Sequence, residues 1–173
     1  FRTLRNNMSE FSFLNNTIET KFNGIKLESS YNNTPKIIGN TITGTESEYW
    51  GIYASGKIIP VIENNTIEKK KHVIYLYYDD AKVDSRVVDK GNVIKDNHGY
   101  GIRAEGRARP VISLKDIEGN SGYAVDNQTE YTVDARNNWW GETMKAIIES
   151  GDNPRNLDKF YDQFDDSTKG IIN

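Results

Sequence analysis

The chain has 173 residues, of which 36% are hydrophobic and 27% charged, a balance that is typical of one globular domain with its own core. Its formal net charge of −3 and sequence pI near 5.5 argue against a general affinity for nucleic acid. It contains no cysteine, which excludes a disulfide framework and a thiolate metal site, and no run of about 18 apolar residues that could insert into a membrane.

The N-terminal segment indicates that the sequence is part of a longer chain. It begins with Phe1 rather than Met, and it has no signal peptide. We therefore expect a fragment of a longer, processed protein. Residues 11–16, "FSFLNN", have the pattern of a strand, and we expect them to form the third strand of an incomplete coil.

One short phrase, first found as "NNTI" at residues 15–18, returns along the chain. Aligned on their isoleucines, its copies follow one another at spacings of 24, 25, 27 and 23 residues. The aligned residues are Ile18, Ile42, Ile67, Ile94 and Ile117. A constant period of this length is the signature of a repeat fold.

Two further apolar phrases lie between successive copies. The second reads "GIKL", "GIYA", "VIYL", "GIRA" and "YAVD", at residues 24–27, 51–54, 73–76, 101–104 and 123–126. The third reads "PKII", "PVIE", "RVVD", "PVIS" and "TVDA", at residues 35–38, 60–63, 86–89, 110–113 and 132–135. Turn residues separate these runs, and the chain is rich in them, with 19 asparagines and 14 glycines.

Each run has the two-residue period of a strand. In "GIYA", Ile52 and Ala54 share one side while Tyr53 lies on the other. Three strands per repeat, always in the same order, stack most simply as three parallel sheets. The predicted fold class is therefore all-β, a right-handed parallel β-helix of about five coils. A leucine-rich repeat would need a leucine framework, and a propeller would need about 40 residues per blade.

The unequal spacings predict loops at the corners of the coils. The two longest are "TGTESEYWG" at residues 43–51 and "YLYYDDAKVDSR" at residues 75–86, and they fall in neighbouring coils. The basic run at residues 69–71 is interpreted as a solvated turn.

After "NNWWG" at residues 137–141 the pattern changes. Residues 142–151, "ETMKAIIESG", place Met144, Ile147 and Ile148 on one side and end in glycine, which predicts a short helix. Residues 157–164, "LDKFYDQF", are expected to add a turn or two. We divide the single domain into coils at residues 1–138 and a C-terminal cap at residues 139–173, where one of the two adjacent tryptophans closes the core and the other packs under the helix.

One asparagine column is predicted at the first corner. It consists of Asn16, Asn40, Asn65 and Asn92, each two positions before an aligned isoleucine, and Asn138 at its end. Asparagine tolerates the left-handed conformation of a tight corner, and its amide can bond to its neighbours in the stack, so we interpret the column as structural.

The coil pattern resembles the right-handed β-helix repeats of the pectate-lyase-like superfamily. The motif "DARNNWWG" at residues 134–141, with the acidic tail "FDDSTKGIIN" at residues 164–173, resembles the C-terminal ends of secreted microbial β-helix repeat proteins. The resemblance implies a microbial protein that is secreted or lies on the cell surface. Because that superfamily includes lyases, hydrolases, epimerases, tailspikes and adhesins, it does not imply one activity.

The outward side of the second strand carries aromatic and charged residues together. The candidate ligand-binding residues are Trp50, Tyr53, Tyr75, Tyr77, Tyr100 and Arg103. Aromatic rings beside charged hydrogen-bonding groups suit a carbohydrate surface. The alternative is that these tyrosines only reflect the high propensity of tyrosine for strands.

Catalysis is the second possibility for this side of the sheet. Lyases of the superfamily typically use acidic residues for calcium and an Arg or Lys as base, which makes Arg103, Glu105, Asp79 and Asp80 the candidates here. The acidic residues of the loops, which also include Asp84, Glu46 and Glu48, are interpreted as solvated side chains in turns. Their spacing is not that of a known calcium loop, but a calcium ion remains an open possibility. His72 and His98 lie in different predicted loops and make a poor metal site, so no other cofactor is predicted.

The leading hypothesis is a non-catalytic, secreted or cell-surface domain that presents this aromatic and charged side to polysaccharide or to another surface partner. The alternatives are a polysaccharide lyase or glycoside hydrolase, and a structural spacer without a ligand. Neither nucleic acid nor membrane insertion is expected, and the oligomeric state is left open.

Overall fold

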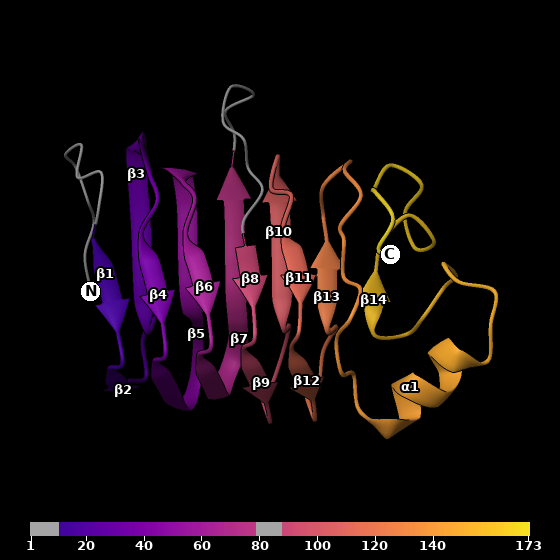
Figure 1. The fold of residues 1–173 in the computed structure, drawn as a ribbon, viewed down its shortest axis with the longest axis horizontal. Coiled ribbons are helices and arrows are strands. Elements are labelled where there is room, and N and C mark those ends of the chain that lie inside the picture. Colours follow the sequence, from indigo (N-terminus) through magenta and orange to yellow (C-terminus); the bar gives the residue numbers. More distant parts are fainter. Residues whose placement is uncertain (1–10, 79–87) are drawn as a thin grey trace.

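The computed structural model describes residues 11–78 and 88–173, and of residues 45–48, 88 and 89 it describes the backbone only. The strands stack side by side along one axis, with β1 at one end and helix α1 (Glu142–Glu149) at the other (Figure 1). One sheet contains β1 (Ser12–Leu14), β4 (Lys36–Ile38), β6 (Val61–Glu63), β8 (Val88–Lys90) and β11 (Val111–Ser113). The other contains β2 (Thr17–Glu19), β3 (Ile25–Asn33), β5 (Thr41–Ile58), β7 (Thr66–Tyr78), β9 (Val93–Lys95), β10 (Ile102–Gly106), β12 (Asp116–Glu118), β13 (Val125–Asn127) and β14 (Phe160–Tyr161).

The strand pairings of the described residues are parallel, and the first phrase pairs as its alignment predicts. Ile18 pairs with Ile42, Ile42 with Ile67, Ile67 with Ile94, and Ile94 with Ile117. Five aligned isoleucines bound four intervals, and the chain forms a solenoid of about four turns. The predicted parallel β-helix is confirmed, and β1 pairs with β4 as the expected third strand of an incomplete coil. The alignment is wrong by one residue for "YAVD", "RVVD" and "TVDA", because Ile102 pairs with Val125, Ile62 with Asp89, and Val111 with Asp134.

The strands form two hydrogen-bonded sheets rather than the three predicted. The reason is that β5 and β7 continue through the corner between the first and second phrases instead of breaking there. Their pairing shifts register on either side of Ser47, so the bend is made by irregular pairing within extended chain. Residues 43–51 are therefore part of a strand, contrary to the predicted loop. Of the second predicted loop, residues 75–78 end β7, and residues 79–87 lie outside the described residues.

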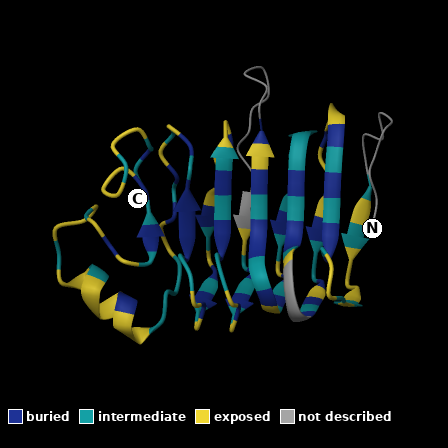
Figure 2. Ribbon diagram, turned by 180° about the vertical axis from the view of Figure 1, so that it is seen from behind, coloured by how far each residue is buried: buried dark blue, intermediate teal, exposed yellow. Residues whose placement is uncertain are grey.

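The core lies inside the coils, where one side chain per rung stacks on the equivalent residue of the next. On the second strand these are Ile25, Ile52, Ile74, Ile102 and Val125, all fully buried. Buried and partly exposed residues alternate along the strands, whereas α1 is largely exposed (Figure 2). Burying each of these branched side chains contributes about 2 kcal/mol.

Two adjacent residues form the first corner of each coil. One has a left-handed backbone conformation, and the next occupies a position of the asparagine column. The left-handed residues are Asn15, Gly39, Asn64, Gly91, Leu114 and Asn137, with φ between 53° and 70°. Five of the six precede a residue of the predicted asparagine column, and Leu114 precedes Lys115. The expectation that the column residues themselves are left-handed is therefore wrong. A Cβ at Gly39 would lie 2.2 Å from Oδ1 of Asn15, so this position needs glycine for space as well as for φ.

The C-terminal residues add one more rung to the solenoid. Trp139 bridges to Asp116, β14 pairs with β13, and Ile172 bridges to Val133. The predicted helix is present as α1, inserted at the corner between Trp139 and β14. Residues 157–164 do contain turns, at residues 158–159 and from residue 163, but no helix. Between the turns, β14 buries Phe160 and leaves Tyr161 partly exposed, which is the alternation of a strand.

Candidate binding face

Five aromatic side chains form a continuous column along the outer side of the second strand. We call Trp50, His72, Tyr100, Tyr123 and Tyr161 the ring column; each is half-buried. Successive ring centroids lie 4.5, 4.9, 6.0 and 5.6 Å apart. The rings of His72, Tyr100 and Tyr123 are nearly parallel, with interplanar angles of 12° and 4°. Rings at these separations stabilise one another by offset stacking.

A second row runs beside the ring column, on the first outward position of the same strands. Parallel registers align Lys26, Tyr53, Tyr75, Arg103, Asp126 and Tyr161. Tyr161 thus belongs to this row by register and joins the ring column through its contact with Tyr123. The rings of Tyr53 and Tyr75 stack at 4.9 Å, and Nζ of Lys26 lies 5.3 Å from the Tyr53 ring centroid. The row joins the ring column where Tyr75 approaches Trp50, with centroids 4.9 Å apart.

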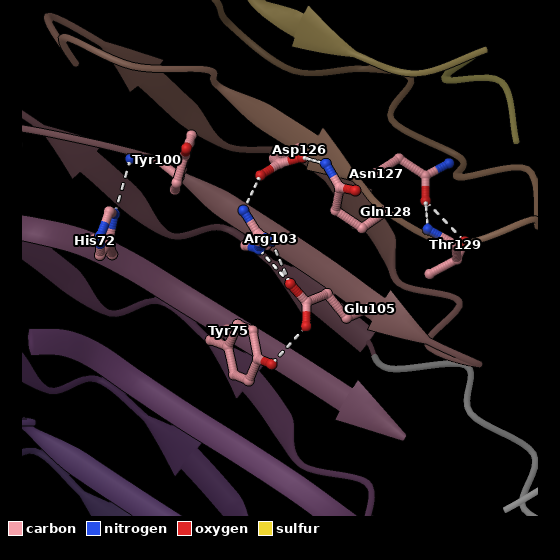
Figure 3. A network of polar contacts seen from close by, with 9 residues as sticks. All are labelled: His72, Tyr75, Tyr100, Arg103, Glu105, Asp126, Asn127, Gln128 and Thr129. Atoms are coloured by element: carbon pink, nitrogen blue, oxygen red, sulfur yellow. Dashed lines mark hydrogen bonds and ion pairs between the residues drawn. The ribbon is translucent and has the colours of Figure 1, made fainter. Parts of the chain in front are cut away.

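Part of this row belongs to a polar network (Figure 3). Tyr75 Oη donates a 2.7 Å hydrogen bond to Oε2 of Glu105, and Arg103 Nε donates to Oε1 of Glu105 at 2.5 Å. Arg103 Nη1 lies 2.8 Å from Oδ2 of Asp126, whose Oδ1 accepts a 2.7 Å hydrogen bond from Nε2 of Gln128. The guanidinium is also 5.4 Å from the Tyr100 ring centroid, so the network contacts the ring column.

Burial and hydrogen bonding shift the pKa values of three residues in the polar network. Burial disfavours the charged form of Arg103, but the Asp126 and Glu105 carboxylates outweigh it and raise the pKa of the guanidinium. Burial and the hydrogen bond to Glu105 raise the pKa of the Tyr75 phenol. Burial also raises the pKa of Asp126, which is only 1% exposed. The two carboxylates therefore favour the charged form of the Arg103 guanidinium.

The structure brings together five of the six predicted ligand-binding residues: Trp50, Tyr53, Tyr75, Tyr100 and Arg103. Tyr77, the sixth, lies at the next outward position, in register with Ser55 and Glu105, and is 36% exposed. Of the catalytic candidates, Arg103 and Glu105 contact each other. Asp79, Asp80 and Asp84 lie outside the described residues, as do the side chains of Glu46 and Glu48.

Residues that were not predicted complete this face. His72, like Trp50 and Tyr100, lies immediately before the second apolar phrase, so its sequence position could have revealed it. Tyr123 is the first residue of "YAVD" as aligned, and it falls level with Tyr100 only in the structural register, in which Ile102 pairs with Val125. Instead of lying in a loop, His72 lies within β7, and its Nδ1 accepts a hydrogen bond from the backbone of Tyr100 at 3.3 Å. No feature of the sequence marked Asp126 and Gln128 as part of this face, because they join the polar network only through the register of their strand with that of Arg103.

The asparagine column is continuous from Asn16 to Asn92. Nδ2 of each residue donates to Oδ1 of the next at 2.8–2.9 Å, in the pairs Asn16–Asn40, Asn40–Asn65 and Asn65–Asn92. Lys115 takes the following position, and its backbone N–H donates to Oδ1 of Asn138 at 3.0 Å. The amides therefore bond to one another and to the backbone inside the corner.

A second column, not predicted from the sequence, lies at the next corner. The backbone N–H of Lys70 donates to Oδ1 of Asn97, and Nδ2 of Asn97 donates to Oδ1 of Asn120, both at 2.9 Å. The ammonium of Lys70 donates to the backbone carbonyls of Thr20 and Phe22 at 2.7 and 2.6 Å. Lys70 is 0% exposed and lies in β7, so the expected solvated turn is wrong.

Neither a metal centre nor a membrane span is found in the described ranges. Residues 11–78 and 88–173 contain no group of three or more His, Asp or Glu side chains placed to hold a metal ion. Within the same ranges, no helix combines the length and apolarity needed to cross a bilayer.

Comparison with known protein families identifies the architecture. A family model described as a right handed beta helix region matches residues 23–173. Comparison with curated proteins and with solved structures gives no match. The matched residues include the ring column, the polar network and the C-terminal rung. Because the match covers most of the chain and agrees with the parallel registers, the chain belongs to the right-handed β-helix family.

Proposed function

We propose that this chain is a non-catalytic module that binds polysaccharide through the ring column and the adjoining row from Lys26 to Asp126. The observation that carries the proposal is the ring column itself, which continues over successive rungs and whose five side chains are each only partly buried. The resemblance to pectate-lyase-like and secreted microbial repeat proteins supports a location outside the cell or on its surface.

The stacking decides how such a ligand would be held. Inside the column, neighbouring rings cover one another's faces, so the column offers ring edges, tyrosine hydroxyls and the indole N–H. These groups recur at the rung spacing of about 4.8 Å. An extended polysaccharide along the solenoid axis would therefore meet an aromatic side chain at each rung of the ring column, with tyrosine hydroxyls at the last three.

The state of the polar network favours binding over catalysis. A lyase that used Arg103 as its base would need a lowered pKa, whereas both carboxylates raise it. The oxygens of Glu105 and Asp126 accept hydrogen bonds from Tyr75, Arg103 and Gln128. A lyase or hydrolase that relies on Asp79 and Asp80 is the alternative, and a spacer without a ligand is the third.

A glycan array with the purified chain tests the proposal. We expect binding to a polysaccharide and a loss of about tenfold in affinity in Tyr53→Ala and in Tyr75→Ala, because each removes a ring and the groups that it positions. Tyr31→Ala is the matched control, since Tyr31 is exposed and lies outside both rows. If the chain binds no glycan, the proposal is contradicted and the structural spacer is favoured. If the chain has uronate-lyase activity, the enzyme hypothesis replaces the proposal.

A further inference from the structure

We infer that the C-terminal rung carries a second site, independent of the ring column, which binds a small organic anion with an apolar body. A cavity of about 490 Å³ lies between α1, the segment that follows it and the last rung. This volume falls within the range of about 300–1,000 Å³ that is typical of small-molecule sites.

The walls of the cavity are mainly apolar. They include Trp139, Trp140, Ile148, Leu157, Phe160 and Ile172. Trp140 and Phe160 pack edge to face with ring centroids 4.9 Å apart, which fixes the orientation of both rings. An aromatic or branched apolar group could therefore replace water against rigid walls.

Apolar and polar contacts together hold the helix beside the cavity, and Ile148 packs against the core cluster to which Met144 belongs. Met144 is the only buried residue of α1. At the C-terminal end, Nδ2 of Asn153 donates to the carbonyl of Ile148 at 2.7 Å, and Arg155 donates to the carbonyl of Ile147 and to Oγ of Ser150. These bonds satisfy helix-end carbonyls and tie the helix to the following segment, which also lines the cavity.

The charges around the cavity select the ligand. Its lining contains three cationic side chains, Arg136, Lys145 and Arg155, and one acidic side chain, Glu149. Arg136 is paired with Asp134, and Arg155 is bound to the helix end. Lys145 lies over the Trp139 ring at 5.8 Å, and in residues 11–78 and 88–173 no described carboxylate is within 4 Å of its ammonium. An anionic group at Lys145 would complete this arrangement.

The test uses 1-anilinonaphthalene-8-sulfonate as the anionic probe and N-phenyl-1-naphthylamine as its uncharged counterpart, with the whole chain. We expect Lys145→Gln to weaken binding of the sulfonate about tenfold and to leave the uncharged probe unchanged, since one charge-assisted contact is lost. Ile148→Trp, which fills the cavity, should weaken both probes. Lys36→Gln, an exposed lysine on β4, is the matched control and should change neither.

A second readout does not depend on filling the cavity. Bound probe should quench emission from Trp139 and Trp140 by energy transfer, and Trp140→Phe should reduce that quenching. The inference is overturned if the sulfonate does not bind. It is also overturned if Lys145→Gln weakens both probes equally, or if a folded Ile148→Trp variant binds both probes as the unmodified chain does.

Discussion

Asn65 and Asn92 bond to each other inside the first corner of the solenoid. Nδ2 of Asn65 donates to Oδ1 of Asn92 at 2.8 Å, and the same Nδ2 donates to the carbonyl of Ile37 at 2.8 Å. Oδ1 of Asn65 accepts from both nitrogens of Asn40 at 2.9 Å. The amide is thus fully used by the neighbouring coils, and we expect the asparagine column to contribute to stability.

Replacing Asn65 by alanine should lower the free energy of unfolding by about 3 kcal/mol, because several buried donors and acceptors lose their partner. Urea denaturation measures this. Asn64→Gly is the matched control at the adjacent left-handed position, where two other coils carry glycine, and should change stability by less than about 1 kcal/mol. Equal losses in the two variants would contradict the different roles of these positions, in which Asn65 supplies buried hydrogen bonds and residue 64 only a left-handed backbone.

Removing the central ring of the ring column should destabilise the stack on both sides. Tyr100 contacts His72 and Tyr123, and the Arg103 guanidinium lies over its ring. We expect Tyr100→Ala to cost about 2 kcal/mol, measured by thermal unfolding, with a weaker near-ultraviolet circular dichroism signal. Tyr100→Phe keeps the ring and should behave as the unmodified chain. A similar cost for both variants would mean that the hydroxyl, not the stacking, matters.

The buried ammonium of Lys70 predicts a pH-dependent stability. Burial lowers the pKa of Lys70 in the folded chain, whereas the unfolded chain has the ordinary lysine value of about 10.4. Folding therefore favours the neutral amine, and its contribution is lost as pH falls through the folded-state pKa. We expect the stability of the unmodified chain relative to Lys70→Met to increase as pH rises from 7 towards about 10.4.

Urea midpoints of both proteins at several pH values measure this difference, in which the titrations of other groups cancel. A difference that stays constant, or that falls as pH rises, would contradict the assignment of the effect to burial of the Lys70 ammonium.

Two phenylalanines of the last rung, four residues apart in sequence, should contribute unequally to stability. Phe160 is 9% exposed and packs against Trp140, whereas Phe164 is 39% exposed. Phe160→Ala should cost about 3 kcal/mol, because it leaves a void in the core, and Phe164→Ala less than about 1 kcal/mol. Thermal unfolding compares the two. Equal costs would restore the helical interpretation of residues 157–164, in which both side chains share one apolar side.

The candidate face was predictable in part. The aromatic residues Trp50, Tyr53, Tyr75 and Tyr100 could be located because each occupies a fixed place in the repeat. Tyr161 could not, because it reaches the ring column only after the insertion of α1, which breaks the period. Of the polar network, Asp126 and Gln128 were not predicted, since Asp126 meets Arg103 through the register of two strands that are 23 residues apart in sequence.

The repeat spacing was sufficient to predict a parallel β-helix, the isoleucine registers and the membership of the asparagine column. This is possible because a solenoid places equivalent residues of successive coils next to each other, so sequence period and spatial contact coincide. The corners and the end of the solenoid depend on contacts that no period encodes. Whether β5 and β7 bend or break, how Lys70 reaches Thr20 and Phe22, and how α1 stands beside Trp140 are decided by packing and hydrogen bonding in the folded chain.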